Sequence, residues 1–251
     1  MNLSVIIPAY NADFTIRRTI NSLLSYLPKH FPIFELVIVD DASFDNTFKE
    51  VSSFKDPHLR IIRHQKNRGK FGALKSGVQA SSGTCRIFTD ADLPYEISAI
   101  PYLAHLITNF GFHIAIGDRT LEESIDLTGQ DRIRRLFSSA CRTAVRLLAA
   151  GQIFDTQCGL KAIRGDVADT VFPLIQDDGF AGDIELLYIA LKYNLAIRRV
   201  PVKLQHSGTT TVRLGVDSLK ILRRLVMLRF SWRSGDYKSQ QLKEIAKQEY
   251  R

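Results

Sequence analysis

The feature that most constrains the fold is a repeated alternation of short apolar runs with segments of helical spacing. Runs rich in Val, Ile and Leu alternate with segments whose apolar residues recur every three or four positions; the runs are 3–8, 35–39, 59–63 and 85–89, and the segments 12–27, 45–54 and 69–80. Buried parallel strands read as continuous apolar runs, and strand–helix–strand connections are right-handed. The pattern predicts an α/β fold with a mainly parallel sheet flanked by helices.

The second half is less regular and predicts a mixture of elements. We expect helices at 97–110, 130–150, 165–175, 183–193 and 216–232, strands at 112–116 and 196–204, and a strand or loop at 153–163. We assign residues 1–213 to the α/β domain and residues 214–251 to a C-terminal appendage. This appendage is expected to be a basic amphipathic helix followed by a polar tail.

Composition limits the class of protein. No run of about 18 uncharged apolar residues occurs, so no membrane-spanning helix is predicted. The first residues lack the basic start of a secretory leader, and the three cysteines lie far apart without CxxC spacing. We therefore expect a reduced, cytoplasmic protein without a zinc site. The net charge of +8 fits either a plain basic surface or an anionic partner.

Two carboxylates, Asp90 and Asp92, follow the predicted strand at 85–89. Ligands bind beyond the carboxyl ends of parallel strands, and like charges this close are costly without a cation. Mg²⁺ or Mn²⁺ takes oxygen ligands from carboxylates and phosphates, so this pair is a candidate metal site. Asp41 and Asp45 have a structural alternative as helix caps or turn residues. Lys70, at the start of a predicted helix, is a candidate phosphate ligand, with a plain basic loop as the alternative.

Two predicted helices are rich in basic residues. The helix at 130–150 has apolar residues at helical spacing and five arginines, which suit phosphate: Arg132, Arg134, Arg135, Arg142 and Arg146. The helix at 216–233 carries five cations and no acid after Asp217: Lys220, Arg223, Arg224, Arg229 and Arg233. Such a helix can lie on an anionic membrane. The alternatives are a solvated charged face for the first and packing against the domain for the second. No nucleic-acid-binding motif is found.

Eight motifs in this order resemble the family 2 glycosyltransferases of the GT-A fold. They are SVIIPAYNAD (4–13), ELVIVDDASFDNT (35–47), NRGKFGALKSGV (67–78), FTDADLP (88–94), GDR (117–119), DTQCGLKAIRGD (155–166), FAGDIELLYIAL (180–191) and VPVKLQHSGTT (200–210). A lone DxD is weak, whereas the ordered set, spanning about residues 3–213, is specific. The DTQCGLK and DIELL segments are similar to the polyprenyl-phosphate branch, above all to dolichyl-phosphate β-glucosyltransferases.

This resemblance implies a nucleotide-sugar donor, UDP-glucose first and GDP-mannose second, and a polyprenyl-phosphate acceptor. It implies Mg²⁺ or Mn²⁺ held by Asp90 and Asp92, and a donor site formed by Pro8, Ala9, Tyr10, Asp40, Lys70, Asp90, Ala91 and Asp92. The candidate catalytic residues are Asp183, Arg119 and Arg135, and His206 is a candidate contact of the diphosphate or metal. The chain departs from the family pattern at Pro94, where the mannosyltransferases have a Gln, and at Gly182, which replaces an aromatic residue.

The reaction implied is direct displacement at the anomeric carbon with inversion. A phosphate acceptor is already an anion and needs no strong base, whereas a saccharide or other hydroxyl acceptor would need one, and Asp183 is the candidate. A non-catalytic nucleotide-sugar-binding or membrane-interaction module is disfavoured because Asp40, Asp90, Asp92 and Arg119 are all present. We expect peripheral contact with the inner face of an anionic membrane.

Overall fold

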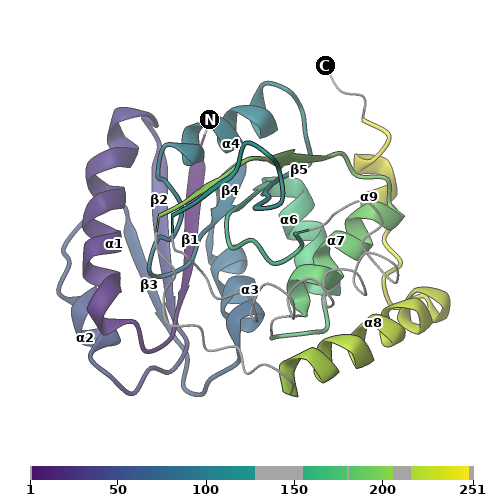
Figure 1. Ribbon diagram of the computed structural model, residues 1–251, viewed down its shortest axis with the longest axis horizontal. Coiled ribbons are helices and arrows are strands. Elements are labelled where there is room, and N and C mark those ends of the chain that lie inside the picture. The colour runs from purple at the N-terminus through teal and green to yellow at the C-terminus, as the bar shows by residue number, and fades with distance from the viewer. Residues whose placement is uncertain (1, 128–154, 180, 206–215, 249–251) are drawn as a thin grey trace.

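The computed structural model describes residues 2–127, 155–179, 181–205 and 216–248. A seven-stranded sheet in the order β3-β2-β1-β4-β7-β5-β8 forms its centre (Figure 1). The strands are β1 (Leu3–Ala9), β2 (Phe34–Asp40), β3 (Leu59–Arg63), β4 (Cys85–Phe88), β5 (Ile114–Gly117), β7 (Lys161–Arg164) and β8 (Ile197–Val200). Of these strands only β7 is antiparallel to its neighbours, β4 and β5. The predicted mainly parallel sheet is confirmed.

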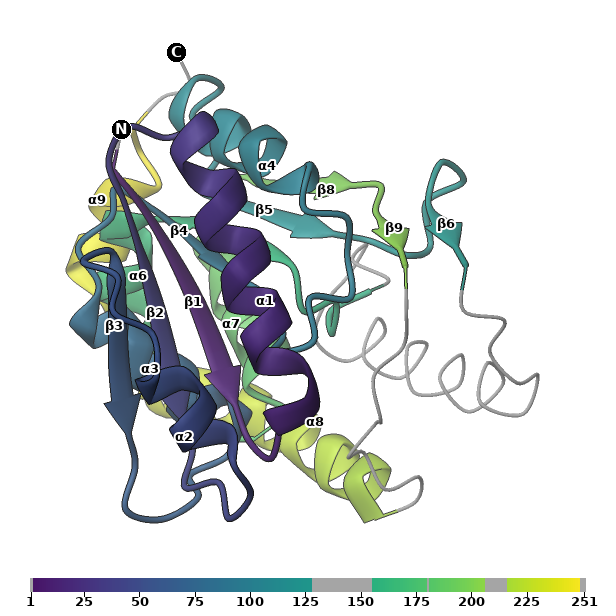
Figure 2. The ribbon, with the colours of Figure 1, turned by 90° about the vertical axis from the view of Figure 1, so that its left-hand side faces the viewer.

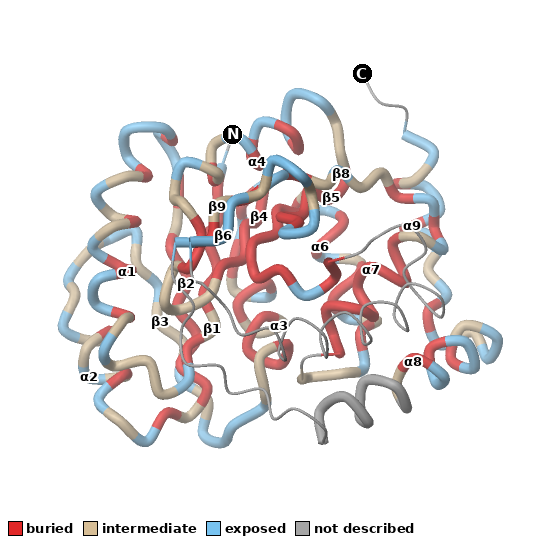
Figure 3. The backbone as a smooth tube through the Cα atoms, viewed as in Figure 1, coloured by how far each residue is buried: buried red, intermediate tan, exposed pale blue. Residues whose placement is uncertain are grey.

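Helices cover both faces of the sheet. One face carries α1 (Asp13–Tyr26), its extension η1 (Leu27–Lys29), α2 (Thr47–Ser52) and α4 (Ala99–Thr108). The other carries α3 (Lys70–Ala80), α6 (Gly165–Val171), η3 (Phe172–Leu174) and α7 (Gly182–Lys192). Alternate residues of β1 serve the two faces, since Ile6 joins one core cluster while Val5 and Ile7 join the other. The central strands are therefore buried on both sides (Figure 3).

The predicted strand at 196–204 is interrupted. It forms β8 and the short β9 (Lys203–Leu204), which pairs with β6 (Ile125–Asp126) in a separate two-stranded sheet. Pro201 lies between the two pieces, and proline has no backbone N–H to donate to a strand ladder. The break directs residues 203–204 away from the main sheet, towards the loop that follows Asp92, where Tyr95 bridges to Leu204.

Two helices complete the described chain, α8 (Val216–Ser234) and α9 (Gln240–Ile245). The predicted helix at 216–232 is confirmed, but the prediction of a polar tail is wrong, because Tyr237, Leu242 and Ile245 are buried in the core cluster of α7. Leu225 and Leu228 of α8 join the same cluster. Figures 1 and 2 both place α8 at the end of the sheet where β1 and β2 terminate.

Candidate active site

Three neighbouring strands, β2, β1 and β4, end on polar loops at the same edge of the sheet. The loops after β1 and β2 are joined by side chain–backbone hydrogen bonds: Asn11 N donates to Ser43 Oγ (3.0 Å), Phe44 N to Asn11 Oδ1 (3.1 Å) and Ala12 N to Thr47 Oγ1 (2.7 Å). Asn11 adopts a positive φ of 50°, which asparagine tolerates. The sequence therefore builds a fixed platform beside the carboxyl ends of these strands.

Asp40, one of the predicted donor-site residues, lies in this platform with its side chain fully buried. Its Oδ1 accepts a hydrogen bond from Ser43 N (3.1 Å). Arg63 Nε lies 3.2 Å from Oδ2, close enough for an ion pair but outside hydrogen-bond geometry, so Oδ2 has no hydrogen-bond partner. A buried acceptor in this state is costly, and an N–H donor from a ligand would relieve the cost.

Pro8, Ala9 and Tyr10 lie beside Asp40, as Pro8 and Ala9 pair with the end of β2. Tyr10 is 42% exposed, and its ring meets the ring of Phe44 edge to face with centroids 6.1 Å apart. Phe44 is also exposed. These residues place exposed aromatic surface next to an unsatisfied acceptor, which suits a planar heterocycle with an N–H group.

Asp41 serves the structure, in line with the alternative stated for it. Its carboxylate accepts hydrogen bonds from Arg68 N (2.9 Å) and Gly69 N (2.8 Å) and contacts His64 Nδ1 (2.6 Å). It therefore fixes the loop that leads into α3. At the start of α3, Phe71 N and Gly72 N donate to Asp178 O, at 2.8 and 3.0 Å. These two N–H groups of the helix are thus committed within the protein.

Asp90 and Asp92 lie just beyond β4, each at intermediate burial. Asp90 Oδ1 accepts a hydrogen bond from Lys70 Nζ at 2.6 Å. Thr19 Oγ1 donates to Ala91 O (2.8 Å) and holds the loop between the two carboxylates. Burial by itself raises the pKa of Asp90, but the charge and hydrogen bond of Lys70 outweigh it, so this pKa lies below its ordinary value. The shift favours the ionised form of this candidate metal ligand.

The donor set fits a hard divalent cation only in part. Asp90 and Asp92 supply carboxylate oxygens, as Mg²⁺ and Mn²⁺ prefer. Within the described ranges, no group of three His, Cys, Asp or Glu side chains could hold an ion. An ion at Asp90 and Asp92 would therefore complete its coordination with oxygens from a bound ligand or from water.

The absence of a side chain at Gly159 leaves the space that the carboxylate of Asp90 occupies. A Cβ at this position would lie 1.9 Å from Asp90 Oδ2, so any larger residue would displace the carboxylate.

We predict that Gly159→Ala lowers the affinity for Mn²⁺ and UDP together by about tenfold or more, since each lost charge-assisted contact weakens binding by roughly that factor. Isothermal titration measures it. Gly179→Ala is the matched control, because the nearest atom to its Cβ is Asp177 Oδ1 at 3.3 Å; equal affinities in the two variants would refute the prediction.

Arg119 is fixed by a residue that sequence reasoning missed. Arg119 Nε and a terminal guanidinium nitrogen each lie 2.7 Å from an oxygen of Asp155, and Arg119 N donates to the same carboxylate (3.0 Å). Burial raises the pKa of Asp155, but Arg119 outweighs it and holds the pKa below its ordinary value. This fork geometry orients the guanidinium. Asp155 begins the DTQCGLK motif, which was the available signal.

Asp183, the candidate base, is paired with a second missed residue. Lys161 Nζ lies 2.7 Å from Asp183 Oδ1 and 2.5 Å from Cys158 O, and both side chains are buried. Burial by itself lowers the pKa of Lys70, but the carboxylates of Asp90 and Asp183 outweigh it and raise the pKa above its ordinary value. The structure thus brings Lys70, Asp90, Lys161 and Asp183 into one cluster of alternating charge. A carboxylate bound to a buried lysine is poorly arranged to take a proton from a hydroxyl.

Glu185 does not join this cluster, although it lies in the same DIELL segment as Asp183. It is fully buried and accepts from Gln176 N (2.9 Å), Asp177 N (3.0 Å) and Tyr237 Oη (2.7 Å). An Arg224 nitrogen contacts its two oxygens at 2.8 and 2.9 Å. Glu185 therefore anchors α8 and the following segment to α7.

The departure at Gly182 also has a structural reason. A Cβ at Gly182 would lie 2.3 Å from Cγ of Phe71, whose ring stacks on Phe172 with centroids 5.3 Å apart. Phe71 fills the space that a larger residue at position 182 would need. Two candidate site residues, Arg135 and His206, lie outside the described residues, as does the predicted helix at 130–150.

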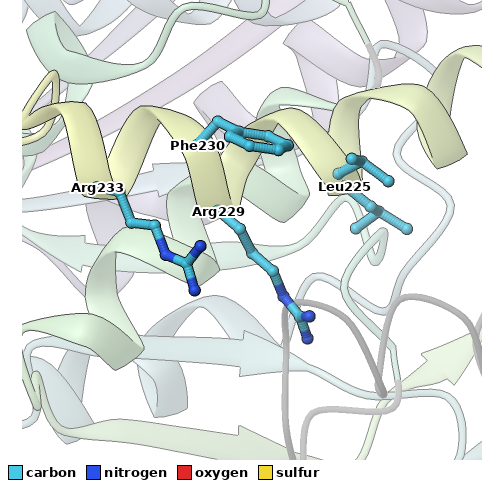
Figure 4. Close-up of a pocket in the computed structure, with 5 residues that line it drawn as sticks. Leu225, Arg229, Phe230 and Arg233 are labelled. Atoms are coloured by element: carbon cyan, nitrogen blue, oxygen red, sulfur yellow. The ribbon is translucent and has the colours of Figure 1, made fainter.

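The outward face of α8 is apolar and basic. Val226, Met227 and Phe230 are exposed, Phe230 by 65%. A pocket of about 250 Å³ on this helix is lined by Leu225, Val226, Arg229, Phe230 and Arg233. Figure 4 shows the side chains of Arg229 and Arg233 extending to the same side of the helix, with the ring of Phe230 lying over the helix ribbon. No helix in the described ranges is both long and apolar enough to span a bilayer.

Comparison with known proteins gives a consistent set of matches. The family model described as Glycosyl transferase family 2 matches residues 4–172. The dolichyl-phosphate beta-glucosyltransferase of Saccharomyces cerevisiae is 29% identical over 255 residues, covering 94% of this chain and 76% of the relative. The dolichyl-phosphate beta-glucosyltransferase of Homo sapiens is 31% identical over 252 residues, covering 92% and 77%.

Solved structures share the fold. Glucosyl-3-phosphoglycerate synthase from Mycobacterium tuberculosis, in complex with phosphoglyceric acid, aligns with a TM-score of 0.69 and 22% identity over 90% of this chain and 79% of that one. The same enzyme with Mn²⁺, UDP-glucose and phosphoglyceric acid aligns with a TM-score of 0.69 and 21% identity, with the same coverage. The predicted GT-A fold is confirmed by these neighbours.

Proposed function

We propose that this chain, which belongs to glycosyl transferase family 2, transfers a glucosyl residue from UDP-glucose to a polyprenyl phosphate. GDP-mannose is the second candidate donor. The observation that carries the proposal is the cluster in which Asp90 and Asp183 alternate with Lys70 and Lys161 at the carboxyl ends of the strands. In this cluster each carboxylate is already paired with a lysine, which supports a transfer that uses no strong base. The names of the yeast and human relatives support the choice of sugar and acceptor.

Each group of the site has a distinct part in this proposal. Asp40 offers Oδ2, which accepts no hydrogen bond from the described residues, to an N–H of the base beside Tyr10. Asp90 and Asp92 would hold Mg²⁺ or Mn²⁺, which when bound neutralises the departing diphosphate. Arg119, oriented by Asp155, faces the developing charge, and Lys70 adds a second cation. The acceptor phosphate is already an anion, so it attacks the anomeric carbon directly and inverts its configuration.

The effect of replacing Asp183 on the transfer rate distinguishes a phosphate acceptor from a hydroxyl acceptor. We predict that Asp183→Asn keeps phosphate transfer within about tenfold of the wild type, because a general base contributes about 10²–10⁴-fold only where a proton must be removed. Single-turnover rates with polyprenyl phosphate measure this. The double variant Asp183→Asn/Lys161→Met controls for the lysine left unpaired in the core. A loss of 10³-fold or more in both variants, with melting temperatures kept, would show that Asp183 itself acts in phosphate transfer and would contradict the prediction.

We also propose that α8 brings the site to an anionic membrane, where such an acceptor resides. Its outward face combines exposed apolar residues with Arg229 and Arg233, a pattern typical of interfacial helices.

We predict that Phe230→Asp weakens binding to vesicles containing phosphatidylserine by about tenfold, from the loss of one aromatic ring that would be buried in the bilayer. Co-sedimentation measures it. Phe110→Asp, at an exposed phenylalanine that follows α4, is the control. Unchanged binding by the Phe230 variant would remove the membrane proposal.

A further inference from the structure

The ammonium group of Lys70 donates a hydrogen bond to one carboxylate oxygen of Asp90, the first aspartate of the DxD motif. Lys70 Nζ lies 2.6 Å from Asp90 Oδ1. On the other side, Gly159 approaches so closely that a Cβ there would reach 1.9 Å from Oδ2. The carboxylate is thus held between a cation and the backbone of the DTQCGLK segment. A metal ion approaching Asp90 meets a positive charge already in contact with it.

We propose that Lys70 holds the place of the metal ion at Asp90 and that the ion enters only together with a nucleotide diphosphate. This inference rests on the proposed function, because it assumes that the diphosphate of a donor binds at Asp90 and Asp92. On arrival of the ion, the ammonium group leaves Asp90 Oδ1 and contacts the diphosphate. Lys70 is in this sense a positioning residue that sets the order of binding.

Charge explains why the ion alone binds weakly. A divalent cation and an ammonium group on one carboxylate repel each other strongly at such short range. The described part of the chain has no group of three metal-binding side chains that could offset this repulsion. A diphosphate changes the balance, because it brings oxygen ligands for the ion and negative charge for the displaced lysine. Ion and nucleotide therefore favour each other's binding.

The structure allows the side chain to move while its backbone stays in place. The start of α3 is held by Asp41, which accepts from Gly69 N, and by Asp178 O, which accepts from Phe71 N and Gly72 N. The Lys70 side chain is 21% exposed, and its four-carbon stem has several rotatable bonds.

The test is a titration with Mn²⁺, followed by the electron paramagnetic resonance signal of the free ion, with and without UDP. For the wild type we expect weak binding of Mn²⁺ alone and binding at least about tenfold tighter with UDP. Lys70→Met should bind Mn²⁺ alone about tenfold more tightly than the wild type, since one charge-assisted contact no longer competes. Lys70→Arg should behave like the wild type. Lys75→Met, which removes a lysine of the same helix paired with Asp178 at 2.5 Å, is the matched control.

The outcomes separate this inference from the proposed function. If the wild type binds Mn²⁺ with UDP but Lys70→Met binds Mn²⁺ alone no more tightly, the role of Lys70 is wrong and the donor site stands. If the wild type binds Mn²⁺ equally well without UDP, the coupled entry is wrong. If neither Mn²⁺ nor UDP binds to any folded variant, the proposed function itself fails. Circular dichroism spectra confirm that each variant is folded.

Discussion

Asp92→Ala is expected to lower metal-dependent transfer by at least about 10³-fold. The variant would lose a carboxylate that holds the metal ion, and the ion is needed to neutralise the charge of the departing diphosphate. Asp92 lies beyond the end of β4 at intermediate burial, so the fold should persist. The measurement is transfer of radiolabelled glucose from UDP-glucose to polyprenyl phosphate, with saturating Mn²⁺.

The control for this variant is Asp56→Ala, which removes a carboxylate between α2 and β3. Its Oδ1 accepts a hydrogen bond from His58 N and contacts the ring of the same residue. It should transfer at the wild-type rate. Turnover of Asp92→Ala at the rate of this control would show that Asp92 does not hold the ion. A melting temperature far below that of the control would assign the loss to folding instead, and the conservative Asp92→Asn would then repeat the test.

Arg224→Met is expected to lower the free energy of unfolding by about 3 kcal/mol, because breaking one side of a buried ion pair leaves an uncompensated charge. The charge in question is Glu185, whose side chain is fully buried, whereas that of Arg224 is 14% exposed. The pair also connects α8 to α7, so the loss should extend to the packing of Leu225 and Leu228. Urea unfolding followed by tryptophan fluorescence is the measurement, as Trp232 packs at this boundary.

Arg233→Met is the matched control, since it removes the same side chain from the exposed face of the same helix. Surface substitutions usually change stability by within about 0.5 kcal/mol. Equal losses in the two variants would mean that the Glu185 contact contributes nothing particular. A specific loss at Arg224 would show that Glu185 acts in anchoring the C-terminal helices, apart from the chemistry at Asp183.

The sheet and the position of the DxD pair could be predicted because both depend on local pattern. Apolar runs identified the parallel strands, and the polar residues that follow them fall at one edge of the sheet by the geometry of the fold. The contacts that orient the site could not be predicted in this way. Arg119 and Asp155 are separated by 36 residues, and Lys161 and Asp183 by 22. Their meeting depends on β7 entering the sheet antiparallel between β4 and β5.

Two further differences have simple physical reasons. Asp183 and Glu185 are close together in the motif. Residues at positions i and i+2 of an α-helix point about 200° apart, so these two side chains contact different parts of the protein. That spacing was a signal available in the sequence. The last helix, α9, was missed because its apolar contribution within six residues is Leu242 and Ile245 alone. So short a helix is stable only when it packs against the rest of the protein, and packing is not visible in a local pattern.

The most direct test of the metal bridge is diffraction from crystals soaked with UDP-glucose and Mn²⁺, with data collected for the anomalous signal of manganese. The bridge predicts one strong anomalous peak in contact with carboxylate oxygens of Asp90 and Asp92 and with oxygens of the diphosphate. Nucleotide bound at Asp40 with the manganese peak absent from Asp90 and Asp92 would contradict it.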